Sequence, residues 1–469
     1  MTAVAERLGR LLEGYFGGRP PVRLRAWDGS ETGPADAPVV VVGSRRALRR
    51  LLWQPSGLGL AEAYIAGELD IEGDLPDGLG RVARALRERG DAPGRPGPRE
   101  LAAAAATALR LGALGPRPAP PGVRRAAPRG EKHSTGRDRA AISHHYDLSN
   151  AWYAELLDPS MAYSCGYWTE SPGTPRDEPT TATAGAGADP GTGADPGTGA
   201  GTGAGSDGAG TGYGLAEAQR DKLELVCRKL ALAPGARLLD MGCGWGSLAL
   251  YAAREFKARV TAVTLSREQR DFVAARVEEE GLGGLVEVRL SHYRDLAADA
   301  GGYDAVSAIE MGEHVGEEHY PDFAARLHAL LRPRGRLLMQ QMSRGADAPG
   351  GGAFIETYIV PDMHMRPVGR TVDLLEGAGL EVRSVEAMRE HYVRTIAAWY
   401  RTLEERRPAF AALAGDAAVR VWRLYLAGSM LAFAERRMGV DQILAVRPEE
   451  AGDSGLPATP RDWYAPVRP

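Results

Sequence analysis

The sequence predicts an α/β fold built on a doubly wound, mostly parallel sheet, with a small α+β domain ahead of it. Strand-like apolar segments alternate with helix-like segments over residues 216–342, which is typical of parallel sheets with crossover helices. A compact region with its own strand and helix signals precedes them at residues 1–90. The chain has 469 residues, 44% of them hydrophobic, which is enough for two to four domains of ordinary size.

The first elements lie in the N-terminal region. Residues 22–27 (VRLRAW) and 39–43 (VVVVG) have the apolar, β-branched character of strands, and residues 60–73 (LAEAYIAGELDIEG) have the pattern of a helix. We therefore expect a small α+β domain at residues 1–90. Residues 91–139 are rich in Pro, Ala and Arg, and we interpret them as a linker with a short alanine-rich helix inside it.

The larger domain is expected over residues 140–469. Its expected strands are residues 237–242, 259–265, 286–290, 303–310 and 335–342, and its expected helices are residues 216–232, a segment after Gly246, a segment from Ser266, and residues 321–331. Residues 171–214 are rich in Gly, Ala, Thr and Pro and repeat ADPGTG in tandem, so we expect a disordered insert that buries nothing. Ligands of such sheets bind at the carboxyl ends of the strands.

Composition excludes several classes of protein. The chain has 57 Lys and Arg against 61 Asp and Glu, and a net charge of −4 exerts no general attraction on nucleic acid. Three cysteines, an odd number, argue against a disulfide framework and for a reducing compartment. The N-terminus has no signal-peptide pattern, and the most apolar window, residues 101–114, is short and interrupted by Arg110. We expect a cytoplasmic protein that is peripheral to the inner face of the membrane, with the anionic membrane surface as a partner.

The strongest local signal is a glycine-rich turn after a buried strand, residues 238–246 (LLDMGCGWG). Its glycines let the backbone approach a ligand, and Asp240 at the strand end can bind a polar cofactor group. The turn lacks the GxGxxG spacing and the Lys-Ser/Thr of a phosphate loop, which favours S-adenosylmethionine over a dinucleotide or ATP. A purely structural glycine turn is the alternative.

The second strand ends where a ribose-binding group is expected. Asp or Glu is usual there, whereas this chain offers Thr264, Leu265 and Gln269. Ser266 between them is a typical helix N-cap, a role that is compatible with cofactor binding by its neighbours.

Further motifs make the interpretation specific. Residues 144–150 (HHYDLSN), 161–168 (MAYSCGYW), 292–296 (HYRDL) and 313–316 (EHVG) join the two motifs above in one order. Together they resemble the cyclopropane-fatty-acyl-phospholipid synthase family from Ala140 to about Pro448, and more weakly that family's small lipid-binding domain at the N-terminus. The resemblance implies a Rossmann-like class I methyltransferase fold with a lipid tunnel. It also implies methyl transfer from S-adenosylmethionine to a cis double bond in a phospholipid acyl chain.

The resemblance also implies which residues form the site. Methylation of an alkene leaves a carbocation, so the site must exclude water, present aromatic faces or carboxylates, and place a base. Family members hold bicarbonate as that base, and the matching positions are Cys165, Glu313 and Tyr392. The catalytic candidates are Cys165, Glu313, His314, Gln340 and Tyr392; the cofactor candidates are Tyr163, Ser164, Asp240, Gly242, Cys243, Gly244, Gly246, Thr264, Leu265, Gln269 and Tyr293. Tyr163, Tyr167, Trp168 and Tyr392 are expected to line the pocket, with plain core packing as the alternative.

One departure points to a branch of the family. Gln340 stands where the family commonly has a bicarbonate-contacting His, which leaves the presence of bicarbonate open, and residues 309–313 (IEMGE) read as a longer loop with an extra acid. These features resemble the actinobacterial branch that makes 10-methylene fatty acyl chains, precursors of 10-methylstearic (tuberculostearic) acid. In that branch the cation loses a proton after a hydride shift, and a separate reductase then converts methylene to methyl.

Two other readings stay open at this point. The first is the ring-forming synthase itself, whose product has the same mass as the methylene isomer. The second is a lipid-binding or transfer protein with a vestigial cofactor site, against which the intact motifs argue. The oligomeric state is open as well, a homo-oligomer included.

The remaining polar clusters give weaker signals. His314 and His319 are five residues apart, about 140° around a helix, and no HExxH motif is present, so we expect no metal. His144 and His145 are expected to orient the aromatic wall. The arginines between Arg110 and Arg139 are either a solvated linker or contacts for anionic lipid head groups.

Overall fold

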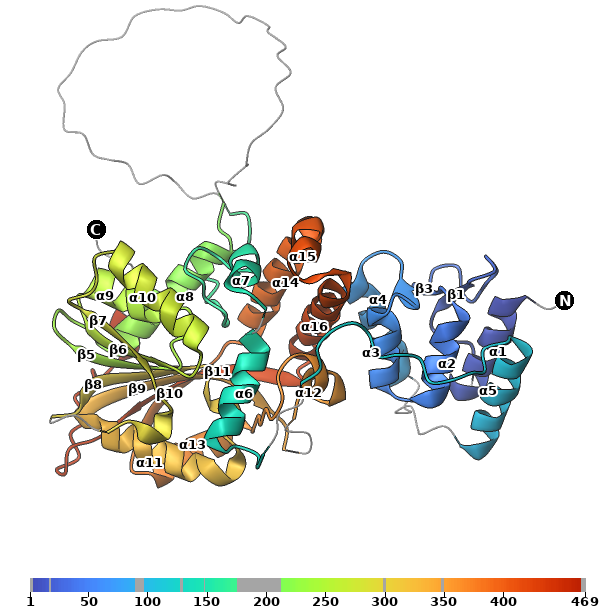
Figure 1. Ribbon diagram of the computed structural model, residues 1–469. Coiled ribbons are helices and arrows are strands. Elements are labelled where there is room, and N and C mark those ends of the chain that lie inside the picture. The colour runs from blue at the N-terminus through green and yellow to red at the C-terminus, as the bar shows by residue number, and fades with distance from the viewer. Residues whose placement is uncertain are drawn as a thin grey trace, which may run out of the picture.

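The computed structural model describes residues 3–16, 18–88, 97–126, 130–146, 148–174, 212–297, 301–346 and 350–464. It divides into a smaller N-terminal unit and a larger unit built around a long sheet, which lie side by side (Figure 1). No helix in the described ranges is long and apolar enough to cross a membrane.

The larger unit contains a seven-stranded sheet in the order β10-β11-β9-β8-β5-β6-β7. Its strands are β5 (Arg237–Met241), β6 (Arg259–Thr264), β7 (Val286–Leu290), β8 (Tyr303–Ile309), β9 (Leu331–Arg344), β10 (Glu381–Ala387) and β11 (Met438–Val446). Strands β5 to β9 pair in parallel, and β11 pairs antiparallel with β9 and β10. The predicted fold class is therefore confirmed.

Helices cover both faces of this sheet (Figure 1). They are α6 (Thr135–Tyr146), α7 (Asn150–Leu156), α8 (Leu215–Lys229), α9 (Ser247–Phe256), α10 (Arg267–Glu279), α11 (Tyr320–Leu330), α12 (Ala353–Tyr358), α13 (Val368–Gly377), α14 (Arg389–Glu405), α15 (Arg407–Ala414) and α16 (Asp416–Ala434). Ser266 caps α10 by accepting a hydrogen bond from the Gln269 N–H at 3.2 Å, as its residue type predicts.

The strand order places a site at one edge of the sheet. After β5 the chain adds β6 and β7 on one side, and it then returns to place β8 on the other side of β5. Such a reversal opens a crevice at the carboxyl ends of the two central strands, which is where doubly wound sheets bind ligands. Strand β5 is almost entirely buried, as a central parallel strand must be.

The smaller unit has a four-stranded sheet in the order β2-β1-β3-β4. Its elements are α1 (Val4–Phe16), β1 (Arg23–Ala26), β2 (Glu31–Thr32), β3 (Val39–Val42), α2 (Arg45–Trp53), α3 (Gly57–Ile65), β4 (Leu69–Ile71) and α4 (Leu75–Glu88). The single helix expected at residues 60–73 is wrong. Helix α3 ends at Ile65, and the left-handed Gly67, with φ of +70°, turns the chain into β4, which pairs with β3.

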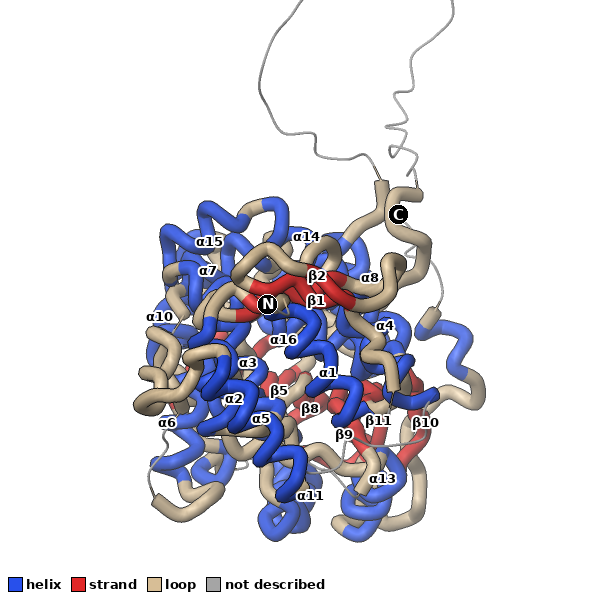
Figure 2. The backbone as a smooth tube through the Cα atoms, turned by 90° about the vertical axis from the view of Figure 1, so that its right-hand side faces the viewer, coloured by secondary structure: helices blue, strands red, loops and turns tan. Residues whose placement is uncertain are grey.

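Part of the expected linker also belongs to this unit. Helix α5 (Pro98–Arg110) packs against α1 and α2, and the three helices lie side by side in Figure 2. Leu111, just after α5, joins the unit's own core with Leu24 and Ala47. The linker is thus folded onto the small unit over this stretch.

The two units share a core. Tyr64 and Ile65 of α3 belong to the same buried cluster as Trp152 and Trp422 of the larger unit. Arg423 on α16 donates a hydrogen bond to the Tyr64 hydroxyl at 2.7 Å. These contacts hold the small unit against α16.

Most of the expected Gly-rich insert, residues 175–211, lies outside the described residues. Its two ends meet, because the Gly173 N–H donates to the Tyr213 carbonyl and the Tyr213 N–H donates to the Thr174 carbonyl, both at 2.8 Å. The insert therefore leaves and re-enters the fold at one point.

Candidate functional site

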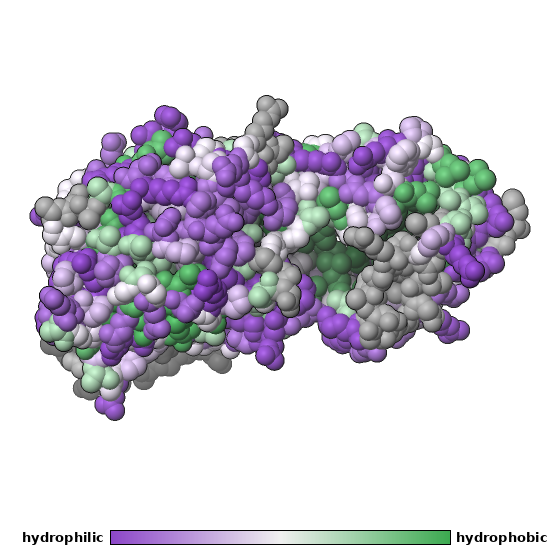
Figure 3. Space-filling view, turned by 90° about the horizontal axis from the view of Figure 1, so that it is seen from below, coloured by the Kyte–Doolittle hydropathy of each residue, from purple (hydrophilic) through white to green (hydrophobic). Residues whose placement is uncertain are grey.

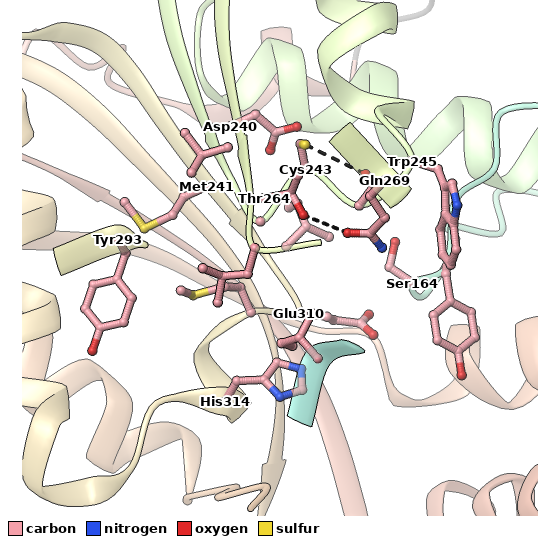
Figure 4. A pocket seen from close by; sticks show the side chains of 18 of the residues that line it. Ser164, Asp240, Met241, Cys243, Trp245, Thr264, Gln269, Tyr293, Glu310 and His314 are labelled. Carbon is pink, nitrogen blue, oxygen red and sulfur yellow. Dashed lines mark hydrogen bonds between the residues drawn. The ribbon is translucent and has the colours of Figure 1, made fainter. Parts of the chain in front are cut away.

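A pocket lies at the carboxyl ends of β5, β6 and β8, where the strand order predicts a crevice (Figure 4). Residues from α6, including Asp138 and Ala141, form part of its wall. Eleven of the residues singled out from the sequence line it: Tyr163, Ser164, Asp240, Gly242, Cys243, Gly244, Thr264, Leu265, Gln269, Tyr293 and His314. The segments that carry them are far apart in the sequence, so the fold assembles the cofactor candidates.

The glycine turn needs glycine for different reasons along its length. Gly242 and Gly244 line the pocket with left-handed backbones, at φ of +85° and +54°. A Cβ on Gly244 would meet nothing within 4 Å, so a side chain there would extend into open space. Gly246 does not line the pocket, contrary to its assignment as a cofactor residue. A Cβ there would lie 2.9 Å from Val273 of α10, so this glycine lets α9 pack on α10.

Three buried polar groups around the pocket have no partner among the described residues. They are the Asp240 Oδ2, the Gln269 Nε2 and the Tyr293 hydroxyl. Their other contacts fix their orientation, because Ser307 donates to Asp240 Oδ1 and Thr264 donates to Gln269 Oε1, each at 2.8 Å. Buried polar groups are nearly always hydrogen-bonded in native proteins, so this pocket is built for a polar ligand. Free acceptors and donors around a glycine turn fit S-adenosylmethionine.

Binding of that cofactor should depend on pH through Asp240. Burial raises the pKa of Asp240 to about 6, and the bond from Ser307 only partly opposes this. Above that pH the carboxylate is ionised and attracts the cationic cofactor; below it the carboxyl becomes neutral. Calorimetry should therefore show affinity falling below pH 6, by up to about tenfold per pH unit. Asp240→Asn should bind the cofactor weakly, and its affinity should not change with pH in this range. If the affinity of the variant fell with pH as steeply as that of the wild type, another group would be responsible.

A second cluster forms around Glu310, which also lines the pocket. The Cys165 N–H and the Gln340 Nε2 donate to its Oε1 at 2.8 and 2.9 Å, and the Tyr392 hydroxyl donates to its Oε2 at 2.6 Å. Burial raises the pKa of Glu310, while these three hydrogen bonds oppose the rise. Three of the residues expected around the base, Cys165, Gln340 and Tyr392, thus do meet, but around a side chain to which the sequence assigned no role.

The backbone at Glu310 explains this outcome. Its φ of +49° lies in the left-handed region, which is rare for a residue other than glycine and carries a conformational cost. Cys165 contributes its backbone N–H, while its thiol lies near the Gly166 carbonyl at 3.3 Å. Burial raises the pKa of that thiol well above its ordinary value, so Cys165 is not a thiolate nucleophile.

Gln340 is oriented by a chain of contacts behind it. Its Oε1 accepts from the Gln442 Nε2 at 3.0 Å, and the Gln442 Oε1 accepts from the Lys229 Nζ at 2.8 Å. The Gln340 amide is thereby turned so that its NH₂ group faces Glu310 and the Cys165 carbonyl. This explains why an amide suits the position where the family has histidine.

Glu313, the base expected from the sequence, is placed elsewhere. It is buried but does not line the pocket, and its Oε1 accepts from the Met342 N–H at 2.5 Å. Burial, together with repulsion from Glu310, raises the pKa of Glu313 to about 8. Its neighbour His314 does line the pocket, and burial lowers the pKa of His314 to about 4, so its imidazole is uncharged at neutral pH.

Sequence reasoning missed Lys222, a buried lysine in the pocket wall. Its ammonium donates to the Ser164 hydroxyl at 3.0 Å. Burial lowers the pKa of Lys222, while attraction to Glu310 raises it. The signal was present, because Gln219, Lys222, Val226 and Lys229 recur at helical spacing on the buried face of α8.

The aromatic wall contains only part of the expected set. Tyr163 lines the pocket, and its ring contacts those of Trp399 and Trp245. Tyr392 does not line it, because its hydroxyl donates to Glu310 at 2.6 Å from behind that side chain. Tyr167 and Trp168 do not line it either: the Tyr167 hydroxyl donates to Glu386 at 2.8 Å, and the Trp168 indole donates to Thr395 at 3.0 Å. Both serve packing and hydrogen bonding beside the site.

Metal ligation finds no support in the described part of the chain, where no group of three His, Cys, Asp or Glu side chains could hold an ion. The side chains of His144 and His145 lie outside the described residues, so their expected role in orienting the aromatic wall stays a prediction.

Comparisons with known proteins show the family to which the chain belongs. A family model for mycolic acid cyclopropane synthetase matches residues 133–184 and 209–443. A probable fatty acid methyltransferase of Mycobacterium tuberculosis is 34% identical over 476 residues, covering 99% of this chain and 100% of its own. A tuberculostearic acid methyltransferase of the same species is 30% identical over 95% of this chain and 91% of its own. The solved structure of a cyclopropane synthase from that species matches with a TM-score of 0.53 and 24% identity, over 66% of this chain and 97% of its own, and shows the shared fold.

Proposed function

Since this chain belongs to the mycolic acid cyclopropane synthetase family of S-adenosylmethionine-dependent lipid methyltransferases, we propose that it methylates the cis double bond of an oleoyl-type phospholipid acyl chain. The product is a 10-methylene acyl chain. Membership of the family confirms the resemblance found in the motifs. The identity of the product depends on which group in the site accepts the proton that the methylated chain loses.

The observation that carries the proposal is the fixed carboxylate of Glu310 in the wall of the pocket. The bound cofactor supplies an electrophilic methyl group. The ring of Tyr163 lines the pocket and can present a π face to a developing cation, and the buried Tyr392 behind Glu310 helps to exclude water. Glu310 then accepts the proton that the methylated chain loses, with its Oε1 held by Cys165 and Gln340 and its Oε2 held by Tyr392.

Bicarbonate does not fit this site. The donors that would bind it already contact Glu310, and a second anion beside a buried carboxylate would be repelled. The side chain of Glu310 therefore takes the role of the base itself.

The contacts of Glu310 also favour the methylene product over a ring. Both routes remove a proton from the transferred carbon, but the methylene route first moves a hydride from the methylated carbon to its neighbour. Hydrogen bonds to both oxygens weaken a carboxylate as a base, which gives the cation time to rearrange. The similarity to a tuberculostearic acid methyltransferase supports the same product.

The ring-forming reaction is the second candidate. The cyclopropane-fatty-acyl-phospholipid synthase of Escherichia coli is 29% identical over 66% of this chain and 68% of its own. Expression of this chain alone in a host fed with oleate decides between the two, with proton NMR of the extracted fatty acids as the measurement. We expect vinylidene signals and no cyclopropyl signals. Cyclopropyl signals alone would contradict the methylene assignment and leave the methyltransferase intact.

We further propose two partners for this reaction. The first is a separate reductase, which would convert the 10-methylene chain into the saturated 10-methyl chain. The second is the membrane that contains the phospholipid substrate.

A further inference from the structure

Helix α5 presents an apolar face to solvent. Ala102, Ala105, Ala106 and Leu109 are exposed at helical spacing i, i+3, i+4 and i+7, so they lie along one side of the helix. Leu109 is 65% exposed. The opposite side faces the core of the small unit, where Ala108 is buried. This helix therefore has one face packed and one apolar face that has no partner among the described residues.

Two more large apolar side chains are exposed near the C-terminal end of α5. Trp53, at the end of α2, is 56% exposed, and Leu114, after α5, is 46% exposed. They are neighbours, since the Trp53 indole donates to the Gly115 carbonyl at 3.1 Å. Arg49 ties the same loop to α2 by donating to the Ala113 and Leu114 carbonyls at 2.9 and 3.0 Å. The exposed side chains are thus held on a rigid surface, and Figure 3 shows green patches of this kind on the N-terminal unit at the right.

The surroundings of this face are basic. Residues 45–53 contain four arginines and residues 98–117 contain three. Two of them are paired with acids of the same unit, because the buried Arg50 contacts Glu68 at 2.9 Å and Arg46 lies 3.7 Å from the same carboxylate. Arg45, Arg110 and Arg117 are exposed. The whole chain has a net charge of −4, so positive charge is concentrated locally at the apolar face.

We propose that this face, made of Trp53, Leu109, Leu114 and the exposed alanines of α5, docks the enzyme on an anionic phospholipid bilayer. Indole and leucine side chains next to guanidinium groups suit the boundary between acyl chains and head groups, whereas small alanines let the helix lie flat on it. The charge of the surface matches an anionic leaflet. The inference rests on the proposed function, because an acyl-chain substrate has to be reached in the membrane.

The position of the face relative to the rest of the molecule fits this use. The view of Figure 3 that shows the green patches also shows an apolar hollow between the two units. This hollow lies beside the N-terminal unit that carries α5, so a bilayer docked on that unit would be next to apolar surface between the units.

Vesicle binding tests the proposal. The variant Trp53→Ala/Leu109→Gln/Leu114→Gln should lose at least about tenfold in partitioning onto vesicles of phosphatidylglycerol and phosphatidylcholine, measured by co-sedimentation. Arg45→Glu/Arg110→Glu/Arg117→Glu should lose the preference for anionic vesicles. The control Leu290→Gln/Val385→Gln removes side chains 37% and 45% exposed on β7 and β10 of the larger unit, and it should bind like the wild type.

Two further measurements keep the outcomes distinct. Methyl transfer to detergent-dispersed phospholipid should be unchanged in the triple variants, so failure of docking and failure of the proposed function are separable. Quenching of tryptophan fluorescence by brominated lipid should fall in Trp53→Phe relative to the wild type. Wild-type vesicle binding by the apolar triple variant, or unchanged quenching in Trp53→Phe, would overturn the proposal.

Discussion

Replacing Glu310 by glutamine should lower turnover by about 10²-fold or more, the usual scale for losing acid–base assistance. The amide keeps the shape of the side chain, but its single oxygen can accept from only one of the two donors, the Cys165 N–H or the Tyr392 hydroxyl, and it cannot take up the proton. Because the pocket keeps its polar lining, affinity for S-adenosylmethionine should stay within about twofold. Single-turnover methyl transfer and calorimetry on the same preparation measure the two quantities separately.

Glu313→Gln is the matched control. It changes another buried carboxyl three residues away that does not line the pocket. With a pKa of about 8, Glu313 is mostly protonated at pH 7, and glutamine resembles that neutral form. We expect turnover near that of the wild type. If Glu313→Gln lost most of its turnover while Glu310→Gln stayed active, Glu313 and not Glu310 would be the base.

The same pKa has a consequence for stability. A carboxyl whose pKa is raised from 4.5 to about 8 in the folded state binds its proton more tightly there, so the stability it contributes falls as the pH rises through that range. Glu313→Gln should remove this loss, and its melting temperature relative to the wild type should increase from pH 6 to pH 8. Equal pH profiles would show that Glu313 is ionised in the fold.

The sequence predicted best those features of the fold that depend only on residues close together in the chain. Alternating strands and helices predicted the sheet, and the glycine turn with Asp240 predicted the pocket, because these signals need only neighbouring residues. The helix expected at residues 60–73 failed because Gly67 adopts a left-handed conformation that the amphipathic pattern does not encode. Gly246 resembled its neighbours in the turn, yet its role depends on Val273, a contact across the fold.

The choice between two acids could not be made from the sequence for the same reason. Glu310 and Glu313 are three residues apart, and the family motif favours the second. Which carboxylate meets Cys165, Gln340 and Tyr392 depends on the backbone at Glu310 and on strands β8 and β9 lying side by side. Lys222 likewise could be predicted as buried from its place on α8, but its contact with Ser164 depends on the packing of a distant segment.

Gly244→Val should abolish measurable binding of S-adenosylmethionine, a loss of at least about 100-fold, because the branched side chain would occupy open space in the pocket wall. Valine in a left-handed conformation also destabilises the fold by about 1–2 kcal/mol. A partly unfolded protein would bind less cofactor, so this destabilisation has to be separated from a direct effect on the pocket. Gly281→Val separates the two effects: Gly281 has φ of +68°, nothing lies within 4 Å of its Cβ, and it is outside the pocket. Both variants should therefore lose similar stability in thermal melts, but only Gly244→Val should lose the cofactor in calorimetry. Unchanged affinity in a folded Gly244→Val protein would remove the turn from the cofactor site.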